Sequence, residues 1–292
     1  MTKKEPRFCD PTIDVAFKRI FGSELYKDAT IGFINSLLTD RVIRDVSFMN
    51  VEIPGFTVED RKSCVDVLCT GDDGSNFVIE MQVVEQEYFR QRTVLYASTL
   101  ISHLAERGHN WDYHLRPTYV ISVIDFTLNE KGLDSCISHF TSREVRTNAK
   151  LDGAPEFFFL EPKRFKKKLN ELSNYQEKWL YLLRDAKSLE VIPDGFQGDR
   201  AFVAYFEASE TANMTKEERI LYDHAMITKT DIEYGKEYSF RKGFEKGRAE
   251  GKAKGKAEGR AEVAKKLLEA GVDISVIQDS TGLSRKELEC IF

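Results

Sequence analysis

Residues 77–83 read Phe-Val-Ile-Glu-Met-Gln-Val, a run of strand-forming residues that is interrupted by a carboxylate and an amide. Successive side chains of a β-strand point to opposite faces, so Glu80 and Gln82 should lie on the same face. The neighbouring residues are apolar enough to predict a buried strand, in which a carboxylate without a partner is costly. This pair of polar side chains therefore marks a candidate functional site.

The residues before this strand predict an antiparallel hairpin. Residues 63–70 are typical of a strand, and Gly71-Asp-Asp-Gly-Ser75 has a strong turn composition. If the turn is centred on residues 72–74, Asp66 falls directly opposite Glu80, with their Cβ atoms about 4.5–5.5 Å apart. Two carboxylates at that range repel each other by roughly 3 kcal/mol at an effective dielectric constant of about 20.

A divalent cation would offset this repulsion. Carboxylate, amide and backbone carbonyl oxygens are the ligands that Mg²⁺ prefers, and Mg²⁺ keeps several waters for use on a phosphate substrate. The alternative is that one acid reaches solvent or pairs with Arg61, Lys62 or Arg92. The apolar residues around both acids favour the metal, because they leave the carboxylates little freedom to reach water independently.

The start of the chain predicts a helix over residues 10–22. Asp10 is placed as its N-cap, Pro11 at its first helical position, and Gly22 where a left-handed C-terminal residue belongs. A second helix should run from Ser23 to about residue 38. We expect it to bury three apolar side chains, namely Leu25, Ile34 and Leu37.

The rest of the first 233 residues alternates strands and helices. Further strands are expected at 46–53, 119–126 and 156–161, and further helices at 87–107 and 165–186. The order of these elements predicts an α/β fold with a mixed central sheet flanked by helices.

The composition changes near Tyr234. Glycine recurs every four residues among Lys, Arg, Glu and Ala, at Gly243, Gly247, Gly251, Gly255 and Gly259. Each glycine costs a helix about 1 kcal/mol relative to alanine. Residues 234–262 are therefore either a solvated helix or linker, or a helix that pairs closely with another through its glycines. Residues 263–292 predict a small helical segment in which two short helices flank Gly282, the size of a helix-turn-helix.

Composition limits the classes of function. The 292-residue chain has 41% hydrophobic residues, a formal net charge of −5, and no apolar run long enough to span a bilayer. Its polar start has no apolar signal-peptide core, so we expect a cytoplasmic protein. The five cysteines fit neither a disulfide framework nor a structural zinc site. The net charge counts against polyanion binding unless positive charge is local, as in the basic tail, or comes from a metal.

Three motifs, taken in order, make a family resemblance visible. Asp14-Val-Ala-Phe-Lys-Arg-Ile-Phe-Gly22, then Asp66, then Ile79-Glu-Met-Gln82 resemble the Asp…Glu-x-Gln form of the PD-(D/E)xK nuclease motif, in which glutamine replaces the usual lysine. Over almost its whole length the chain resembles the Rpn family of recombination-promoting nucleases, also called PD-(D/E)xK nuclease family transposases. The resemblance implies a restriction-endonuclease-like core with a helical C-terminal tail, and a metal-dependent DNA endonuclease.

The resemblance also implies roles for individual residues. Asp66 and Glu80 would bind Mg²⁺ or Mn²⁺, the backbone carbonyl of Met81 would add a ligand, and Gln82 would orient the attacking water or the phosphate. Gln82 cannot supply the positive charge of a lysine, so charge stabilisation would depend more on the metal. Asp14 either joins this catalytic set or forms a plain helical ion pair with Lys18, four residues later.

Nucleic-acid contacts are expected from the helix after the motif and from the tail. Arg92 shares a helix face with Tyr96, Thr99 and His103 and is a candidate for phosphate binding, as is Lys62. The tail would contribute DNA affinity or self-association.

The alternative function is a non-catalytic DNA-binding or oligomerising protein that retains the nuclease fold, although both acids are present. Strand transfer by a transposase would need a 3′-hydroxyl as nucleophile, and no residue points to it.

Overall fold

The computed structural model describes residues 6–53, 63–105, 113–128 and 132–289, and the chain divides into two compact units, residues 1–226 and 227–292. The first unit is built on a six-stranded sheet with the order β1-β4-β5-β6-β8-β7. The bounds of these strands are Val46–Phe48 (β1), Val67–Gly71 (β4), Asn76–Gln82 (β5), Thr118–Ile124 (β6), Ile137–Phe140 (β7) and Glu156–Leu160 (β8). A separate two-stranded sheet pairs β2 (Glu52–Ile53) with β3 (Ser63–Cys64).

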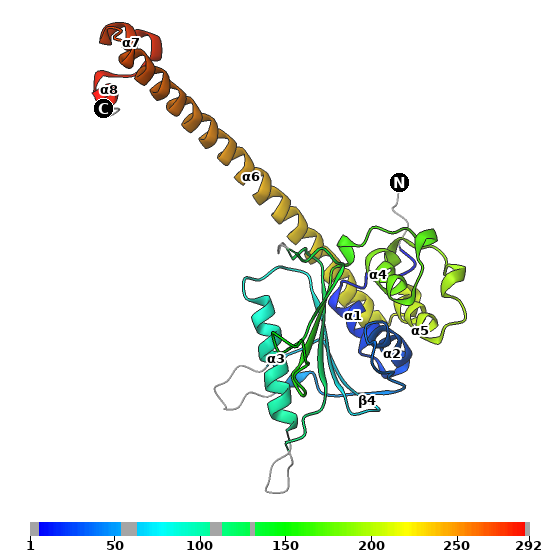
Figure 1. Cartoon of the computed structure of the whole chain (residues 1–292). Coiled ribbons are helices and arrows are strands. Elements are labelled where there is room, and N and C mark those ends of the chain that lie inside the picture. The colour runs from blue at the N-terminus through cyan, green and yellow to red at the C-terminus, as the bar shows by residue number, and fades with distance from the viewer. Residues whose placement is uncertain (1–5, 54–62, 106–112, 129–131, 290–292) are drawn as a thin grey trace. The chain divides into compact units, whose positions relative to one another are not determined.

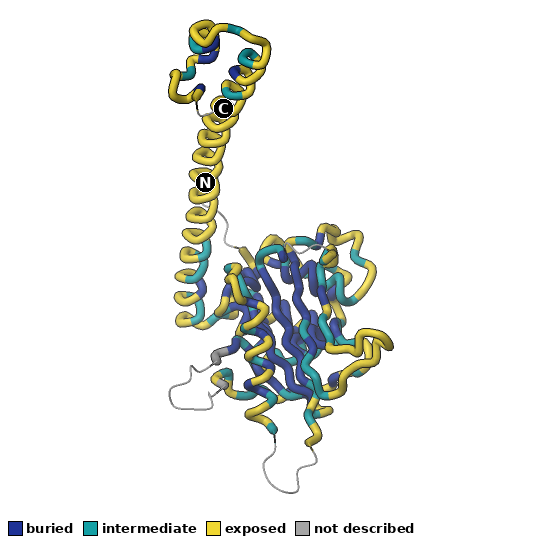
Figure 2. Tube along the Cα trace, turned by 60° about the vertical axis from the view of Figure 1, so that its left-hand side comes forward, coloured by how far each residue is buried: buried dark blue, intermediate teal, exposed yellow. Residues whose placement is uncertain are grey.

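Helices cover both faces of the large sheet (Figure 1). One face is covered by α1 (Asp14–Phe21), α2 (Lys27–Asn35), α4 (Tyr175–Asp185) and α5 (Arg200–Ser209). The other face is covered by α3 (Phe89–Leu104). The central strands are buried on both faces (Figure 2), as is typical of parallel strands between helical layers. The fold is therefore the α/β architecture expected from the sequence, with a mixed sheet flanked by helices.

Side chains of the strands alternate between the two layers. In β5, Phe77 and Ile79 belong to the large core beneath α1, α2, α4 and α5, whereas Val78 packs with Ala97 and Leu100 of α3. Because residues two apart share a face, Glu80 and Gln82 lie on the α3 side of the sheet. Met81 packs against the opposite core, as the sequence predicts.

The predicted register of the hairpin is confirmed. β4 and β5 pair antiparallel with Val67 opposite Ile79 and Leu68 opposite Val78. Asp66 immediately precedes β4, so the same register places it opposite Glu80. The turn supports this register, because the Gly74 backbone adopts φ +82° and its N–H donates to the Gly71 carbonyl at 2.9 Å.

The parallel strands β5, β6 and β8 end at the same edge of the sheet. Glu80 pairs with Ser122 of β6, and Ser122 pairs with Phe159 of β8. These three residues form one row across the α3 face. The carboxyl ends of parallel strands are where α/β sheets usually carry their ligand sites.

The first helix is shorter than the sequence predicts. It begins at Asp14 instead of Pro11, because the Asp10 carboxylate accepts hydrogen bonds from the backbone N–H (3.0 Å) and hydroxyl (2.5 Å) of Thr12 and so closes a turn before the helix. Gly22 ends the helix with φ −120°, outside the left-handed region. Leu25, expected to be buried, is 78% exposed because residues 24–26 form a short 3₁₀ turn at the surface.

Other differences concern short elements. The strand expected at 46–53 divides between β1 and β2, and the helix expected at 165–186 begins only at Tyr175 because residues 165–174 run as a loop and a 3₁₀ turn. Neither the edge strand β7 nor helix α5 was expected from the sequence. Further 3₁₀ turns occupy Pro162–Arg164, Leu169–Glu171, Ala186–Ser188, Asp194–Phe196 and Thr211–Asn213.

The second unit is entirely helical. It contains most of α6 (Lys216–Glu269), followed by α7 (Ile274–Thr281) and α8 (Arg285–Glu289). Ala264, Ile277 and Leu288 form its small core. Residues 234–262 lie within α6, and a Cβ added to any of the five regularly spaced glycines would meet nothing within 4 Å.

Local capping explains the two short helices of the second unit. Asp273 caps α7 by accepting the Ser275 N–H at 2.9 Å, and Gly282 ends it with φ +67°, as the sequence predicts. The Glu287 carboxylate accepts the Ser284 N–H at 2.7 Å, and the Ser284 hydroxyl accepts the Glu287 N–H at 3.3 Å. No helix in the described ranges is long and apolar enough to cross a membrane.

A close approach of α2 and α5 gives a test of this packing. A Cβ at Gly32 would lie 2.3 Å from the Ala201 Cβ and 2.7 Å from the Tyr175 hydroxyl. We expect Gly32→Ala to lower the free energy of unfolding by about 1–3 kcal/mol, because the overpacking outweighs the gain in helix propensity. Chemical denaturation measures the effect. Gly251→Ala, in the exposed part of α6, is the matched control and should not destabilise; an equal response of both variants would contradict the packing.

Candidate functional site

The centre of the candidate site is the Glu80 carboxylate. Glu80 is only 5% exposed, and none of the described residues forms a hydrogen bond or ion pair with its carboxylate. Burial raises its pKa to about 8, and the negative charge of Asp66 acts in the same direction. The Arg92 guanidinium lowers this pKa but does not cancel the other two effects. Glu80 is therefore a buried acid whose ionised form needs a further positive charge.

Asp66 is held beside Glu80 by the backbone of β5. The Met81 N–H donates a hydrogen bond of 2.8 Å to Asp66 Oδ2. Burial raises the pKa of Asp66 above its ordinary value, although the Met81 N–H and the nearby Lys18 ammonium both lower it. The other carboxylate oxygen, Oδ1, lies 3.7 Å from Lys18 Nζ.

Helix α1 brings Asp14 and Lys18 to the edge of this pair. Lys18 Nζ lies 2.8 Å from Asp14 Oδ1, so the helical ion pair is formed. Asp14 is 59% exposed, yet its negative charge contributes to raising the pKa of Asp66. Lys18 thus links Asp14 to Asp66, because its ammonium group contacts both carboxylates.

The backbone carbonyl of Met81 lies on the β4 side of β5. Backbone groups of successive strand residues alternate between the two neighbouring strands. The Gln82 carbonyl accepts the Asp125 N–H at 2.9 Å on the β6 side, whereas the Met81 N–H bonds Asp66 on the β4 side. The Met81 carbonyl shares the direction of its own N–H and is therefore available on the side where Asp66 lies.

Gln82 is bound to Arg92 of α3. Arg92 donates a hydrogen bond of 2.7 Å to Gln82 Oε1, and Gln82 Nε2 donates one of 2.6 Å to the Val84 carbonyl. Arg92 also bonds Gln86, while its buried Nε has no hydrogen-bond partner among the described residues. A guanidinium with an unused donor thus stands where the glutamine itself supplies no charge.

The other residues that were expected to contact nucleic acid do not form one exposed group. Tyr96 is half-buried against the core beneath α3, with the Arg92 guanidinium 5.7 Å from its ring centroid. Thr99 is buried and His103 is exposed. Lys62, the second candidate for phosphate binding, lies outside the described residues.

Ser122 was missed in the sequence. It is fully buried next to Glu80 in the parallel pairing, and its hydroxyl has no hydrogen-bond partner among the described residues. Its signal in the sequence was like that of Glu80, a polar residue inside the apolar run Tyr119-Val-Ile-Ser-Val-Ile124. On the strand pairing, it falls on the Glu80 face.

The donor set fits a hard divalent cation that keeps part of its water shell. Two facing carboxylates and one carbonyl oxygen are available, and Glu80 is a buried acid without a partner. No group of three or more His, Cys, Asp or Glu side chains suited to a metal occurs in the described part of the chain. Mg²⁺ is commonly bound through one or two carboxylates plus waters and phosphate oxygens, so it suits this set better than a metal that needs a complete protein cage.

Comparison with known families matches both units of the chain. The model described as PD-(D/E)XK nuclease family transposase matches residues 11–239. The model described as Rpn/YhgA-like nuclease family, C-terminal HTH domain, matches residues 257–292. Comparisons with curated proteins and with solved structures find no match.

The raised pKa of Glu80 predicts that ionisation of its carboxylate lowers the free energy of unfolding of the metal-free protein. Its pKa is about 8 in the fold against an ordinary 4.5, so the folded state binds the proton more tightly and stability falls as the pH rises from about 4.5 to 8. Glu80→Gln removes this cost. Above pH 8 the variant should exceed the parent protein in free energy of unfolding by up to about 5 kcal/mol, with no difference near pH 4.

Denaturation in EDTA across pH 4–9 measures this difference. Glu87→Gln, at an exposed position five residues after the β5 end, is the control and should follow the parent protein at every pH. A difference between Glu80→Gln and the parent protein that stays constant from pH 4 to 9 would show that the Glu80 carboxylate is not perturbed as described.

Proposed function

We propose that this chain, which belongs to the Rpn family of PD-(D/E)XK nuclease family transposases, is a DNA endonuclease. It would hydrolyse phosphodiester bonds with Mg²⁺ or Mn²⁺. The observation that carries this proposal is the buried, unpartnered Glu80 carboxylate in register with Asp66. The proposal explains why the fold keeps two acids where they repel each other.

Asp66, Glu80 and the Met81 carbonyl would hold the metal. When bound, the metal supplies Lewis acidity at a phosphate oxygen and lowers the pKa of a bound water. The Met81 N–H fixes one Asp66 oxygen, and the other, 3.7 Å from Lys18 Nζ, would be the oxygen that binds the metal. Lys18 limits the negative charge at the open side of the pair, and Asp14 acts there as the partner that orients Lys18.

Arg92 would supply the positive charge that Gln82 lacks. Gln82 Oε1 fixes the guanidinium near the end of β5, so its positive charge would act on a phosphate bound there. One N–H of the Gln82 amide also remains for the attacking water or the phosphate. In this arrangement Gln82 would orient the water or the phosphate and Arg92 would supply the positive charge, two functions that a single lysine usually combines.

The tail would add affinity for DNA. Its match to a C-terminal HTH domain and its excess of basic residues support this role in a chain whose formal net charge is −5. Removal of residues 235–292 should reduce the salt dependence of DNA binding, which is measured from the slope of log Kd against log salt concentration. An unchanged slope would exclude phosphate contacts by the tail.

Plasmid nicking tests the central proposal. The parent protein should nick supercoiled DNA with Mg²⁺ and not in EDTA, and Asp66→Asn and Glu80→Gln should each lower the rate by about 10²-fold or more. Glu207→Gln, at an exposed position of α5, should nick like the parent protein. Cleavage that survives both site substitutions would remove the proposed site, and absence of cleavage with every divalent metal tried would favour a non-catalytic DNA-binding protein with this fold.

The role of Arg92 is tested separately. We expect Arg92→Ala to lower kcat about 10²-fold with a smaller change in KM, because a charge aimed at the phosphate acts mainly in the transition state. Arg92→Lys keeps one positive charge but loses the fork that bonds Gln82, so it should recover only part of the rate. Rates of both variants equal to the parent rate would assign Arg92 to structure alone.

A further inference from the structure

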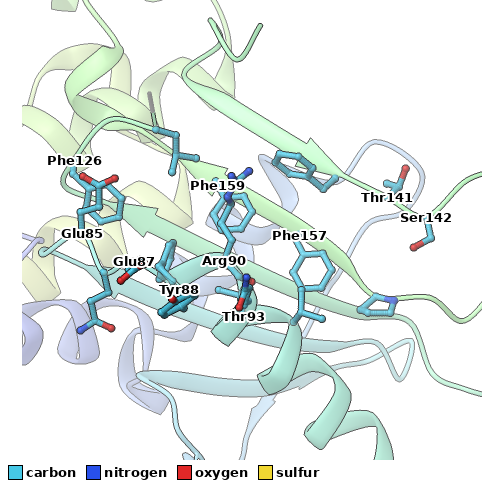
Figure 3. Close-up of a pocket in the computed structure, with 17 residues that line it drawn as sticks. Glu85, Glu87, Tyr88, Arg90, Thr93, Phe126, Thr141, Ser142, Phe157 and Phe159 are labelled. Atoms are coloured by element: carbon cyan, nitrogen blue, oxygen red, sulfur yellow. The ribbon is translucent and has the colours of Figure 1, made fainter. Parts of the chain in front are cut away.

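A second cavity opens on the α3 face of the sheet. It has a volume of about 690 Å³ and lies between the first turns of α3, the segment that leads into α3, and strands β7 and β8 (Figure 3). Aromatic rings dominate its lining: Tyr88, Phe89, Phe126, Phe140, Phe157 and Phe159. Such a cavity is large enough for a flat heterocycle of the size of a nucleobase.

The rings form a continuous wall. The Phe89 ring centroid lies 5.9 Å from that of Phe126 and 5.9 Å from that of Phe159, and Phe140 lies 5.6 Å from Phe159. All three contacts are edge-to-face, so these four rings form one connected aromatic cluster. Tyr88 is 61% exposed at this wall.

The cavity lies near the proposed metal and phosphate site. Glu80, Ser122 and Phe159 occupy one row on three adjacent strands, which places the Phe159 backbone roughly 10 Å from that of Glu80. A second connection runs through α3, because the Arg92 guanidinium that bonds Gln82 lies 5.8 Å from the Phe89 ring centroid. A nucleotide with its phosphate near Arg92 therefore has its base within reach of the cavity.

The charges of the lining favour a base over a phosphate. Glu85 and Glu87 line the cavity together with a single cation, Arg90. Figure 3 shows Arg90 beside Phe157 and Phe159 at the centre, Glu85 and Phe126 toward one end, and Thr141 and Ser142 toward the other. Two carboxylates disfavour an anion, whereas aromatic faces, a guanidinium and hydroxyls suit a planar uncharged ring with polar edges.

We propose that this cavity binds one nucleobase of the DNA, taken out of the base stack, while the adjoining phosphate lies at the Asp66–Glu80 site. The inference rests on the proposed function for the position of the phosphate, and on the cavity itself for the base. Binding would replace base stacking by contact with the aromatic wall, the arrangement by which proteins hold extruded or single-stranded bases. The cavity would thus select unpaired or easily unpaired nucleotides.

The test asks whether substitutions in the cavity weaken the binding of DNA only when the DNA carries bases. Fluorescence anisotropy measures the Kd of full-length Glu80→Gln protein, which should not cleave, for oligothymidine and for a fully abasic oligonucleotide of the same length. Adding Tyr88→Ala, which removes an exposed ring, or Thr141→Trp, which fills the cavity from its end, should raise the Kd for oligothymidine about tenfold. The Kd for the abasic oligonucleotide should change less than twofold.

Leu95→Ala is the matched control, since Leu95 is 58% exposed on α3 and does not line the cavity. It should leave both dissociation constants unchanged. An equal loss on both oligonucleotides, no loss on either, or no binding of oligothymidine before the cavity is changed would each overturn the inference. If the cavity variants lose affinity only for oligothymidine but the parent protein does not nick plasmid DNA, the base site stands and the endonuclease activity is refuted. If the parent protein nicks DNA but the cavity variants do not discriminate between the two oligonucleotides, only the base site is refuted.

Discussion

The candidate site depends on the repulsion between Asp66 and Glu80, two acids that the β4–β5 register places opposite each other. The β4–β5 turn sets their register, and Glu80, paired with Ser122 of β6, is buried on the face of the sheet that α3 covers. Two cations approach them, Lys18 from α1 and Arg92 from α3. The pKa of each acid nevertheless stays above its ordinary value, so the two cations do not compensate for burial and repulsion. A divalent ion would supply the missing charge, which explains why a stable fold retains this arrangement.

The same geometry assigns different tasks to the two helical layers. On one side, α1 carries Lys18 and Asp14 to the Asp66 oxygen that the Met81 N–H does not use. On the other side, α3 carries Arg92 to Gln82 and also forms a wall of the aromatic cavity. Phosphate contacts and some of the base contacts would thus come from α3, whereas the metal ligands would come from β5 and from Asp66 before β4. A single displacement of α3 would disturb both phosphate and base contacts, whereas the carboxylates would keep their register.

Several features could be predicted from the sequence because they depend on local chemistry. The register of Asp66 against Glu80 follows from turn composition and strand alternation, and the turn that ends α7 follows from Gly282. Asp10 misled the prediction of the first helix because its side chain bonds Thr12 instead of capping a helix. Arg92 was predicted to contact phosphate, but its bond to Gln82 depends on how α3 packs on the sheet. The aromatic cavity brings together residues from 85 to 159, and no local pattern predicts such a contact.

The central claim is that Asp66 and Glu80 share one divalent cation. Anomalous diffraction from crystals grown with Mn²⁺ locates the ion directly. We expect one strong Mn²⁺ peak within coordination distance of a carboxylate oxygen of each acid and of the Met81 carbonyl, with water in the remaining positions. Crystals with saturating Mn²⁺ that show no peak between the two acids, or in which the metal contacts only one of them at the protein surface, would contradict it.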